Sequence, residues 1–238
     1  MCTQHYRPHI RSTPPGLARR FPRQVTHCYS WCAAVVYNAD MITGLDDEKW
    51  RLRRRLLQQR RVNAALGAHR QEQEALWGNI QTVLAQYAPP GAAIGAYVPT
   101  REEPGADWFA LLLGERPLIV PRCREDHHLD FCYVTSPDEL IIGAHGLREP
   151  SPEHPAICPE RLHDHSTVLL VPALAATAAG GRLGRGGGYY DRTLVALDAA
   201  VTTVAAVFSE ELLPTLPQAS HDATVDVVVT PQNIFTKS

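Results

Sequence analysis

The run at residues 180–192 reads Gly-Gly-Arg-Leu-Gly-Arg-Gly-Gly-Gly-Tyr-Tyr-Asp-Arg and separates a strand-like segment from a helical pattern. The strand-like segment is the apolar stretch 168–172, and Leu194, Leu197 and Val201 keep helical spacing after the run. A loop that leads into a helix N-terminus gathers free backbone N–H groups at the positive end of the helix dipole. The order of strand, glycine-rich loop and helix therefore predicts an α/β fold that holds an anion.

The side chains inside this run favour a nucleotide over a simple anion. Arginine supplies fork-shaped donors that suit phosphate, tyrosine supplies a stacking face, and aspartate can ligate a metal. The run lacks the Gly-Lys-Ser/Thr ending of a P-loop, and Tyr189 stands where a G-x-G-x-x-G dinucleotide motif needs its last glycine. A flexible surface turn is the alternative reading. The nucleotide reading depends on Arg182, Arg185, Arg192, Tyr189, Tyr190 and Asp191.

Length and composition indicate one globular domain with an appendage. The chain has 238 residues, of which 45% are hydrophobic and 20% charged, and its net charge is −2. This balance gives no general attraction to nucleic acid or membrane, and no apolar segment approaches the roughly 20 residues that span a bilayer. The six cysteines form neither a CxxC pair nor a disulfide framework. We therefore expect reduced thiols and a cytoplasmic protein.

Residues 1–40 differ from the rest of the chain. They contain scattered prolines and arginines and show no hydrophobic period. Their one apolar stretch, 31–37, comes too late and is too short for a secretory signal. Two readings stay open: a disordered tail, or an extension that precedes a true start at Met41.

Hydrophobic periodicity predicts helices that alternate with strands from residue 45 onward. This alternation is typical of an α/β three-layer sandwich with a mostly parallel central sheet, here a single domain over residues 45–238. The expected helices are 46–62, 68–87, 106–113 and 187–200, and the expected strands are 93–97, 118–121, 129–134, 168–171, 202–207 and 225–230, with 143–166 irregular.

Three smaller clusters add candidate ligands. Lys49 and Arg53 lie one helical turn apart and can point together at a phosphate. Glu103 follows a strand, at the edge of an open sheet where ligands gather, and can bind a polar heterocycle. Asp222 precedes the last strand and can join Asp191 in holding Mg²⁺. Each cluster also has a plainer reading, as a solvated helix, a solvated loop or a turn-forming aspartate.

Four histidines raise the question of a zinc site. They are His127, His128, His163 and His165, in two close pairs within irregular segments. No CxxC pattern accompanies them, so the spacing does not favour structural zinc.

Taken together, these segments resemble the 5-formyltetrahydrofolate cyclo-ligases, also called methenyltetrahydrofolate synthetases. Residues 182–192 are similar to the signature loop of that family, and residues 49–53 are similar to its Lys-x-x-Leu-Arg helix. Residues 97–103, 146–150 and 217–230 resemble further family segments in the same order. The resemblance covers residues 45–232, and the first forty residues have no counterpart in the family core.

The resemblance implies an ATP-dependent ligase of folate one-carbon metabolism. In that family the formyl oxygen of 5-formyltetrahydrofolate is thought to attack the γ-phosphate of ATP, which gives an imidate phosphate and ADP. The folate N10 nitrogen then attacks the activated carbon and phosphate leaves. The product is 5,10-methenyltetrahydrofolate, so the protein would mainly position two substrates and neutralise charge.

The resemblance also implies roles for individual residues. Arg185 and Tyr189 would be catalytic, and Asp191 and Asp222 would hold Mg²⁺. ATP would be bound by Lys49, Arg53, Arg182, Leu183, Gly184, Arg185, Gly186, Gly187, Gly188, Tyr189 and Tyr190. The folate, polyglutamylated or not, would be bound by Val98, Glu103, Arg185, Gly186, Gly187, Gly188 and Tyr189.

One position departs from the family pattern, and two other functions stay open. Some family members carry lysine where this chain has Gly187, so Arg185 or Lys49 would have to supply that charge. A nucleotide-binding α/β protein with another substrate would keep the same loop. A nucleic-acid-binding protein would instead use the basic helix 46–62. The sequence is compatible with a monomer or a homodimer.

Overall fold

The fold of residues 44–237 is described by a computed structural model. The described residues lie within one compact unit. The expectation for residues 1–40 therefore lies outside the described residues.

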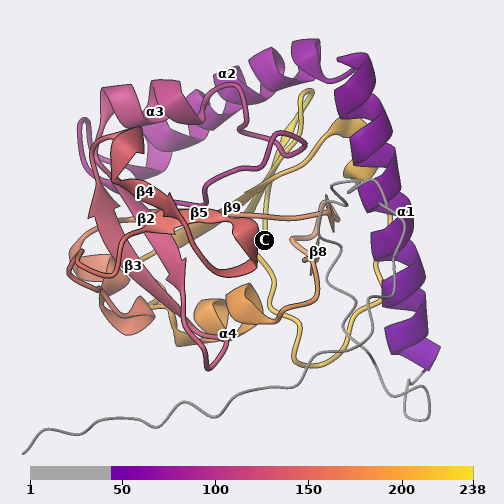
Figure 1. Ribbon diagram of the computed structural model, residues 1–238. Helices are drawn as coiled ribbons and strands as arrows, with labels where there is room; N and C mark the ends of the chain where they lie inside the picture. Colours follow the sequence, from indigo (N-terminus) through magenta and orange to yellow (C-terminus); the bar gives the residue numbers. More distant parts are fainter. Residues whose placement is uncertain (1–43, 238) are drawn as a thin grey trace, which may run out of the picture. The chain divides into compact units, whose positions relative to one another are not determined.

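A seven-stranded sheet forms the centre of this unit, in the order β11-β10-β9-β6-β1-β2-β3 (Figure 1). The five inner strands run parallel, and the two edge strands pair antiparallel with their neighbours. The predicted mostly parallel sheet is confirmed. The strands are β1 (Ile94–Ala96), β2 (Leu118–Cys123), β3 (Leu129–Val134), β6 (Val168–Val171), β9 (Thr202–Ala206), β10 (Val227–Val229) and β11 (Ile234–Thr236).

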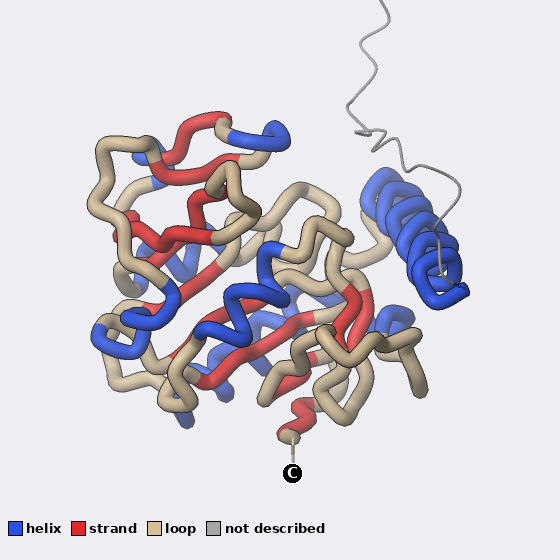
Figure 2. Tube along the Cα trace, turned by 90° about the horizontal axis from the view of Figure 1, so that it is seen from below, coloured by secondary structure: helices blue, strands red, loops and turns tan. Residues whose placement is uncertain are grey.

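Helices cover both faces of the sheet, as the alternation of side chains along β6 requires. Val168 and Leu170 belong to the apolar cluster that includes residues of α2 (Arg70–Tyr87) and α3 (Phe109–Glu115). Leu169 and Val171 belong to the opposite cluster, against which α4 (Tyr189–Ala196) packs. Successive side chains of a strand point to opposite faces, so this division places helices on two sides. Figure 2 shows helical segments on both sides of the strands, and the three-layer architecture is confirmed.

The first helix, α1 (Gly44–Leu66), packs on a small hairpin rather than on the sheet. The hairpin pairs β7 (Ala175–Ala176) with β8 (Arg182–Leu183). Leu56 of α1 is buried with residues of both hairpin strands, and Leu52 and Leu57 pack against the same cluster. The start of the glycine-rich run is therefore a short strand, and α1 holds it in place (Figure 1).

Several element boundaries differ from the expected ones. The helix expected at 187–200 is shorter, because Gly188 takes a left-handed φ of 70° at its start and residue 197 is already extended. The helix expected at 106–113 begins at Phe109, after a turn. Within the segment expected to be irregular, β5 (Arg148–Pro150) pairs with β4 (Leu140–Ile142), and 3-10 turns form at Ala144–Gly146 and Pro159–Asp164. The edge strand β11 was not predicted either.

The expectations about the cysteines and about membrane-spanning segments can be compared with the structure over residues 44–237. Cys132 is buried in β3, and Cys123, Cys132 and Cys158 are free thiols. Among the helices of residues 44–237, none has the length and apolar character needed to cross a membrane.

Candidate functional site

The glycine-rich run and Glu103 lie beyond neighbouring parallel strands. Val98 and Glu103 follow β1, and the hairpin that leads into the run follows β6, the strand paired with β1. The carboxyl ends of adjacent parallel strands form the usual ligand crevice of an open α/β sheet. Gly186 has a φ of 100°, which only glycine adopts readily, so the run turns sharply where the ligand is expected.

The basic face of α1 reaches this run. Arg53 Nε donates a hydrogen bond to the Gly184 carbonyl oxygen at 2.9 Å. The Arg53 guanidinium also lies against Gly186, within van der Waals distance of where a Cβ atom would stand. Lys49, one turn earlier, is buried and forms an ion pair with Asp222. The structure therefore places both predicted phosphate ligands of α1 beside other predicted site residues.

Arg185 and Glu103 meet across the crevice. Arg185 Nε lies 3.1 Å and Nη2 lies 2.9 Å from Glu103 Oε1. The other carboxylate oxygen, Oε2, accepts the Thr100 backbone N–H at 2.8 Å. Only 7% of the Glu103 side chain is exposed. The loop therefore joins the predicted catalytic arginine to the predicted pterin ligand.

The two predicted metal ligands are also held by bases. Asp191 Oδ1 accepts from Arg182 Nη2 at 2.6 Å, and Arg182 donates a further bond to the Pro172 carbonyl oxygen at 3.1 Å. Burial alone would raise the pKa of Asp222, but hydrogen bonds from Lys49 and from the Ala219 backbone lower that pKa below its usual value. Asp222 is therefore ionised at neutral pH.

A common pattern links these three contacts. Each carboxylate that was predicted to bind metal or folate pairs with a base that was predicted to bind phosphate, in the pairs Arg182–Asp191, Arg185–Glu103 and Lys49–Asp222. Three of these side chains, Lys49, Arg182 and Glu103, are buried, and a buried charge needs such a partner.

The two tyrosines of the run have different surroundings. Tyr190 is half-buried, and its hydroxyl atom is buried without a hydrogen-bond partner among the described residues. Burial raises the pKa of this hydroxyl far above its usual value. Burial also raises the pKa of Tyr189, whose hydroxyl lies 3.2 Å from His145 Nε2. Both tyrosines are therefore neutral hydroxyl groups at physiological pH.

Sequence reasoning missed a buried arginine behind Glu103. The Arg60 side chain is 1% exposed and forms two hydrogen bonds with the Glu211 carboxylate, at 2.5 and 2.8 Å. Its Nη2 also donates to the Ala173 carbonyl oxygen at 2.6 Å, and its Nη1 lies 3.9 Å from Glu103 Oε1. This charge supports Glu103 from the interior. Its only signal in the sequence was a basic residue on the apolar side of an amphipathic helix.

The basic helix is only partly available to an external polyanion. Lys49, Arg53 and Arg60 point into the protein, and Arg51 pairs with Asp47 of the same helix at 2.6 Å. This use of its charges weakens the nucleic-acid reading of α1. Two of the four histidines considered as zinc ligands contact different tyrosines: His127 lies against Tyr189, and His165 lies against Tyr133.

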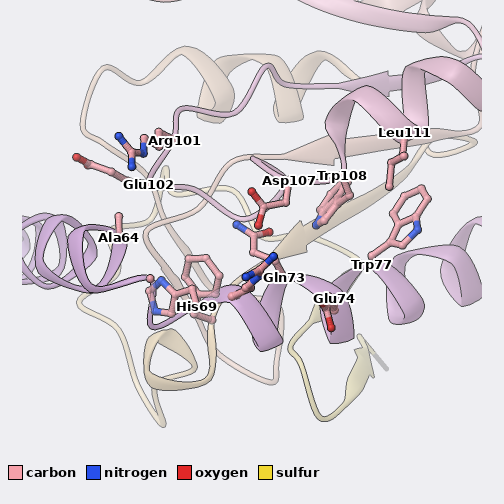
Figure 3. Close-up of a pocket in the computed structure, with 13 residues that line it drawn as sticks. Ala64, His69, Gln73, Glu74, Trp77, Arg101, Glu102, Asp107, Trp108 and Leu111 are labelled. Atoms are coloured by element: carbon pink, nitrogen blue, oxygen red, sulfur yellow. The ribbon is translucent and has the colours of Figure 1, made fainter.

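A cavity of about 560 Å³ is lined in part by Arg101 and Glu102, the two residues before Glu103 (Figure 3). None of its lining residues belongs to the glycine-rich run. Trp77 and Trp108 stack at its wall with ring centroids 5.5 Å apart. Gln73 donates to the Glu103 carbonyl oxygen and accepts the Gly105 N–H, both at 2.9 Å. This wall fixes the backbone that presents Glu103, whereas the converging charges lie outside the cavity.

Comparison with known proteins agrees with this arrangement. The model of the 5-formyltetrahydrofolate cyclo-ligase family matches residues 46–231. A 5-formyltetrahydrofolate cyclo-ligase of Mycolicibacterium smegmatis is 38% identical over 193 residues, which are 77% of this chain and 94% of the relative. The Mus musculus 5-formyltetrahydrofolate cyclo-ligase is 29% identical over 122 residues, 47% of this chain and 58% of the relative.

Solved structures give the same result. The 5,10-methenyltetrahydrofolate synthetase of Aquifex aeolicus superposes with a TM-score of 0.65 at 29% identity, covering 79% of this chain and 92% of that one. A synthetase of the same name from Mycoplasma pneumoniae has a TM-score of 0.58 at 21% identity over 77% of this chain and 99% of its own, a likeness of fold. The family model matches most of the chain, and a relative 38% identical is matched over 94% of its own length. The chain therefore belongs to the 5-formyltetrahydrofolate cyclo-ligase family.

Proposed function

We propose that this protein uses ATP and Mg²⁺ to convert 5-formyltetrahydrofolate to 5,10-methenyltetrahydrofolate, releasing ADP and phosphate. Family membership supports the activity. The observation that supports the chemistry most directly is the contact between Arg185 of the glycine-rich run and Glu103 beyond β1. That contact joins a predicted phosphate ligand to a predicted folate ligand, which a reaction between the two substrates requires.

The nucleotide is proposed to lie along the run, with its phosphates toward α1. Backbone N–H groups of residues 184–188 and the positive start of α4 suit an anion. Arg53 already touches this backbone, and Lys49 lies one turn away on the same helix. The predicted ATP ligands Arg182, Leu183, Gly184, Gly186, Gly187, Gly188 and Tyr190 complete this proposed surface.

The carboxylates fit a hard divalent cation. Asp191 and Asp222 offer oxygen ligands, which Mg²⁺ prefers, and the lowered pKa of Asp222 keeps that group ionised. When bound, Mg²⁺ would neutralise phosphate charge. Lys49 and Arg182, which pair with Asp222 and Asp191, would hold the two carboxylates in position for the cation.

The folate is proposed to bind with its pterin edge on Glu103 and its formyl group toward Arg185. A carboxylate with 7% exposure makes strong hydrogen bonds to a heterocycle because water competes poorly there. The formyl oxygen then attacks the γ-phosphate, and Arg185 neutralises charge on the transferred group. Attack by N10 on the activated carbon and loss of phosphate complete the ring, with Tyr189 and Val98 proposed to position the reacting end.

The paired charges predict that ATP and Mg²⁺ bind cooperatively. Phosphate alone would leave Asp191 and Asp222 without their bases, and Mg²⁺ alone would leave Lys49 and Arg182 without their acids. Binding both ligands satisfies all four side chains. Folate binding in turn requires Arg185 to turn from Glu103 toward phosphate, so we expect MgATP to raise the affinity for folate.

Purified protein incubated with 5-formyltetrahydrofolate, ATP and Mg²⁺ tests the proposal. The expected result is the ultraviolet absorbance of the methenyl product, and omission of either ATP or Mg²⁺ abolishes it. A folded protein that binds ATP but yields no product would act on a different substrate. We expect the enzyme to work as a cytoplasmic monomer or homodimer, without nucleic acid or membrane partners.

A further inference from the structure

Tyr189, the first residue of α4, is flanked by histidines from two separate turns. His127 lies between β2 and β3, and its ring meets the Tyr189 ring edge-on with centroids 5.4 Å apart. His145 lies between β4 and β5, and its ring meets Tyr189 at 6.0 Å. His145 Nε2 also lies 3.2 Å from the Tyr189 hydroxyl oxygen. Two turns that are distant from the run in sequence therefore converge on one of its side chains.

The backbone of both histidines is unusual. His127 has a φ of 61° and His145 a φ of 57°, and within residues 44–237 these are the two non-glycine residues with positive φ. A residue with a Cβ atom takes this conformation uncommonly and at some cost in free energy, and such residues gather at functional sites. Both strained residues contact the same tyrosine, which points to a shared role.

Further hydrogen bonds fasten the turns to the run and to each other. Arg192 donates from Nε to the His127 carbonyl oxygen at 2.9 Å and from Nη2 to the Gly187 carbonyl oxygen at 3.0 Å. Glu149 of β5 accepts the Cys123 backbone N–H of β2 at 3.0 Å. The two turns and the run are therefore parts of one connected assembly.

We propose that His127 and His145 are positioning residues that clamp Tyr189 over the glycine-rich run. His145 directs the tyrosine hydroxyl, and His127 fixes the plane of the ring. The proposal rests on the proposed function, which places Tyr189 beside ATP and folate. A clamped loop is already ordered before the substrates arrive, so less of the binding free energy is spent on ordering it.

The substitution His145→Gly separates this role from a structural one. Glycine suits a φ of 57° and removes only the ring and its hydrogen bond. We expect the melting temperature not to fall, while kcat falls by roughly three- to tenfold, the effect of losing one hydrogen bond. The KM for ATP should change less than kcat. A parallel fall of melting temperature and kcat would mean a structural role and would refute the clamp.

A double-mutant cycle with Tyr189→Phe tests whether His145 acts through the hydroxyl. We expect His145→Gly to cost little further activity in the Tyr189→Phe background. An equal loss in both backgrounds would contradict the proposal. His165→Ala is the matched control, because His165 makes a similar contact with Tyr133, with Nδ1 3.3 Å from the hydroxyl and centroids 5.7 Å apart. This control should keep full activity.

Limited trypsin digestion gives a readout that does not depend on catalysis. The double variant His127→Gly/His145→Gly should be cut after Arg185 several-fold faster than the parent protein, because Tyr189 of the run loses both ring contacts and the hydrogen bond to His145. Unchanged cleavage would refute the clamp. If the parent protein makes no methenyl product, the proposed function fails, and the cleavage rates alone decide whether the clamp exists.

Discussion

Arg185 has a side chain that is 45% exposed, yet it points at Glu103, which is 7% exposed. The difference in exposure suggests which partner moves. Glu103 is held by the Thr100 N–H and by nearby Arg60, so its position is fixed by the interior. Arg185 is free on its outer side and can turn to a ligand. At the residue scale the site therefore has a fixed acid and a movable base.

Replacing Arg185 with alanine should lower kcat by about 10²- to 10³-fold, the usual loss when one group that stabilises transition-state charge is removed. The melting temperature should change little, because Glu103 keeps the Thr100 N–H and the nearby Arg60 charge. Arg185→Lys should be intermediate, since lysine keeps the charge but not the two-pronged geometry. Steady-state kinetics check this, with Arg161→Ala as control because Arg161 is 71% exposed and pairs with Asp164. Normal turnover of Arg185→Ala would remove this residue from the reaction.

The substitution Asp222→Asn should raise the Mg²⁺ concentration needed for half-maximal activity. It should also destabilise the protein by roughly 1–3 kcal/mol, because the buried Lys49 ammonium loses its counter-charge. Magnesium titrations and chemical denaturation measure the two effects. An unchanged magnesium requirement together with lower stability would make Asp222 a partner of Lys49 only.

At the scale of elements, α1 connects stability with nucleotide binding. Leu56 is 5% exposed and packs against the hairpin that opens the glycine-rich run. Leu56→Ala should cost about 2–5 kcal/mol, the usual range for a large-to-small change in a core. ATP affinity should fall as well, because the run loses its support. Leu66→Ala, at a position 76% exposed, is the control. Retained ATP affinity in a destabilised Leu56→Ala protein would separate the helix from the site.

The turn that precedes β4 should respond to acid. Glu139 closes a capping box with Ser136 and accepts from His154. Mainly because of that histidine, its pKa falls from 4.5 to about 2. A lowered folded-state pKa stabilises the protein above the ordinary pKa, and this stability is lost as the pH falls through the folded value. Melting curves should therefore show Glu139→Gln less stable than the parent at pH 7, with the difference shrinking toward pH 2. A constant difference would mean that the carboxylate charge is not involved.

The sequence predicted those elements whose signal is local. The strand 168–171 is a short apolar run and 129–134 is bounded by polar residues, and both were placed at the observed bounds. The start of α4 was misplaced because Gly188 has a left-handed backbone conformation. Glycine adopts positive and negative φ about equally well, so the sequence does not indicate which one occurs. The β4–β5 hairpin was missed because β5 reads Arg-Glu-Pro, which contains no apolar run that would predict a strand.

The contacts of the site could not be predicted in the same way as the helices and strands, because they join residues that are far apart in the sequence. The loop composition indicated phosphate, but the Lys49–Asp222 pair joins residues 173 positions apart and Arg60–Glu211 joins residues 151 apart. No local pattern reports which distant charge a side chain will meet, because the sheet order decides it. The sequence therefore identified the candidate ligands, and the structure shows how they are paired.

At the scale of the whole molecule, the sheet brings four separate segments to one place. The segments are the first helix, the loop beyond β1, the glycine-rich run and the stretch before β10, represented by Lys49, Glu103, Arg185 and Asp222. Each ion pair among them joins two segments. The family match spans all four, from residue 46 to residue 231, so the complete constellation belongs to the family domain.

The central claim is that this constellation joins ATP to the formyl group of a folate. The most direct test follows the absorbance of 5,10-methenyltetrahydrofolate and the release of ADP in the same reaction. The account predicts one ADP for each methenyl product, with both signals dependent on 5-formyltetrahydrofolate and strongly reduced in Glu103→Gln. ADP release without methenyl product, or product formed without ATP, would contradict it.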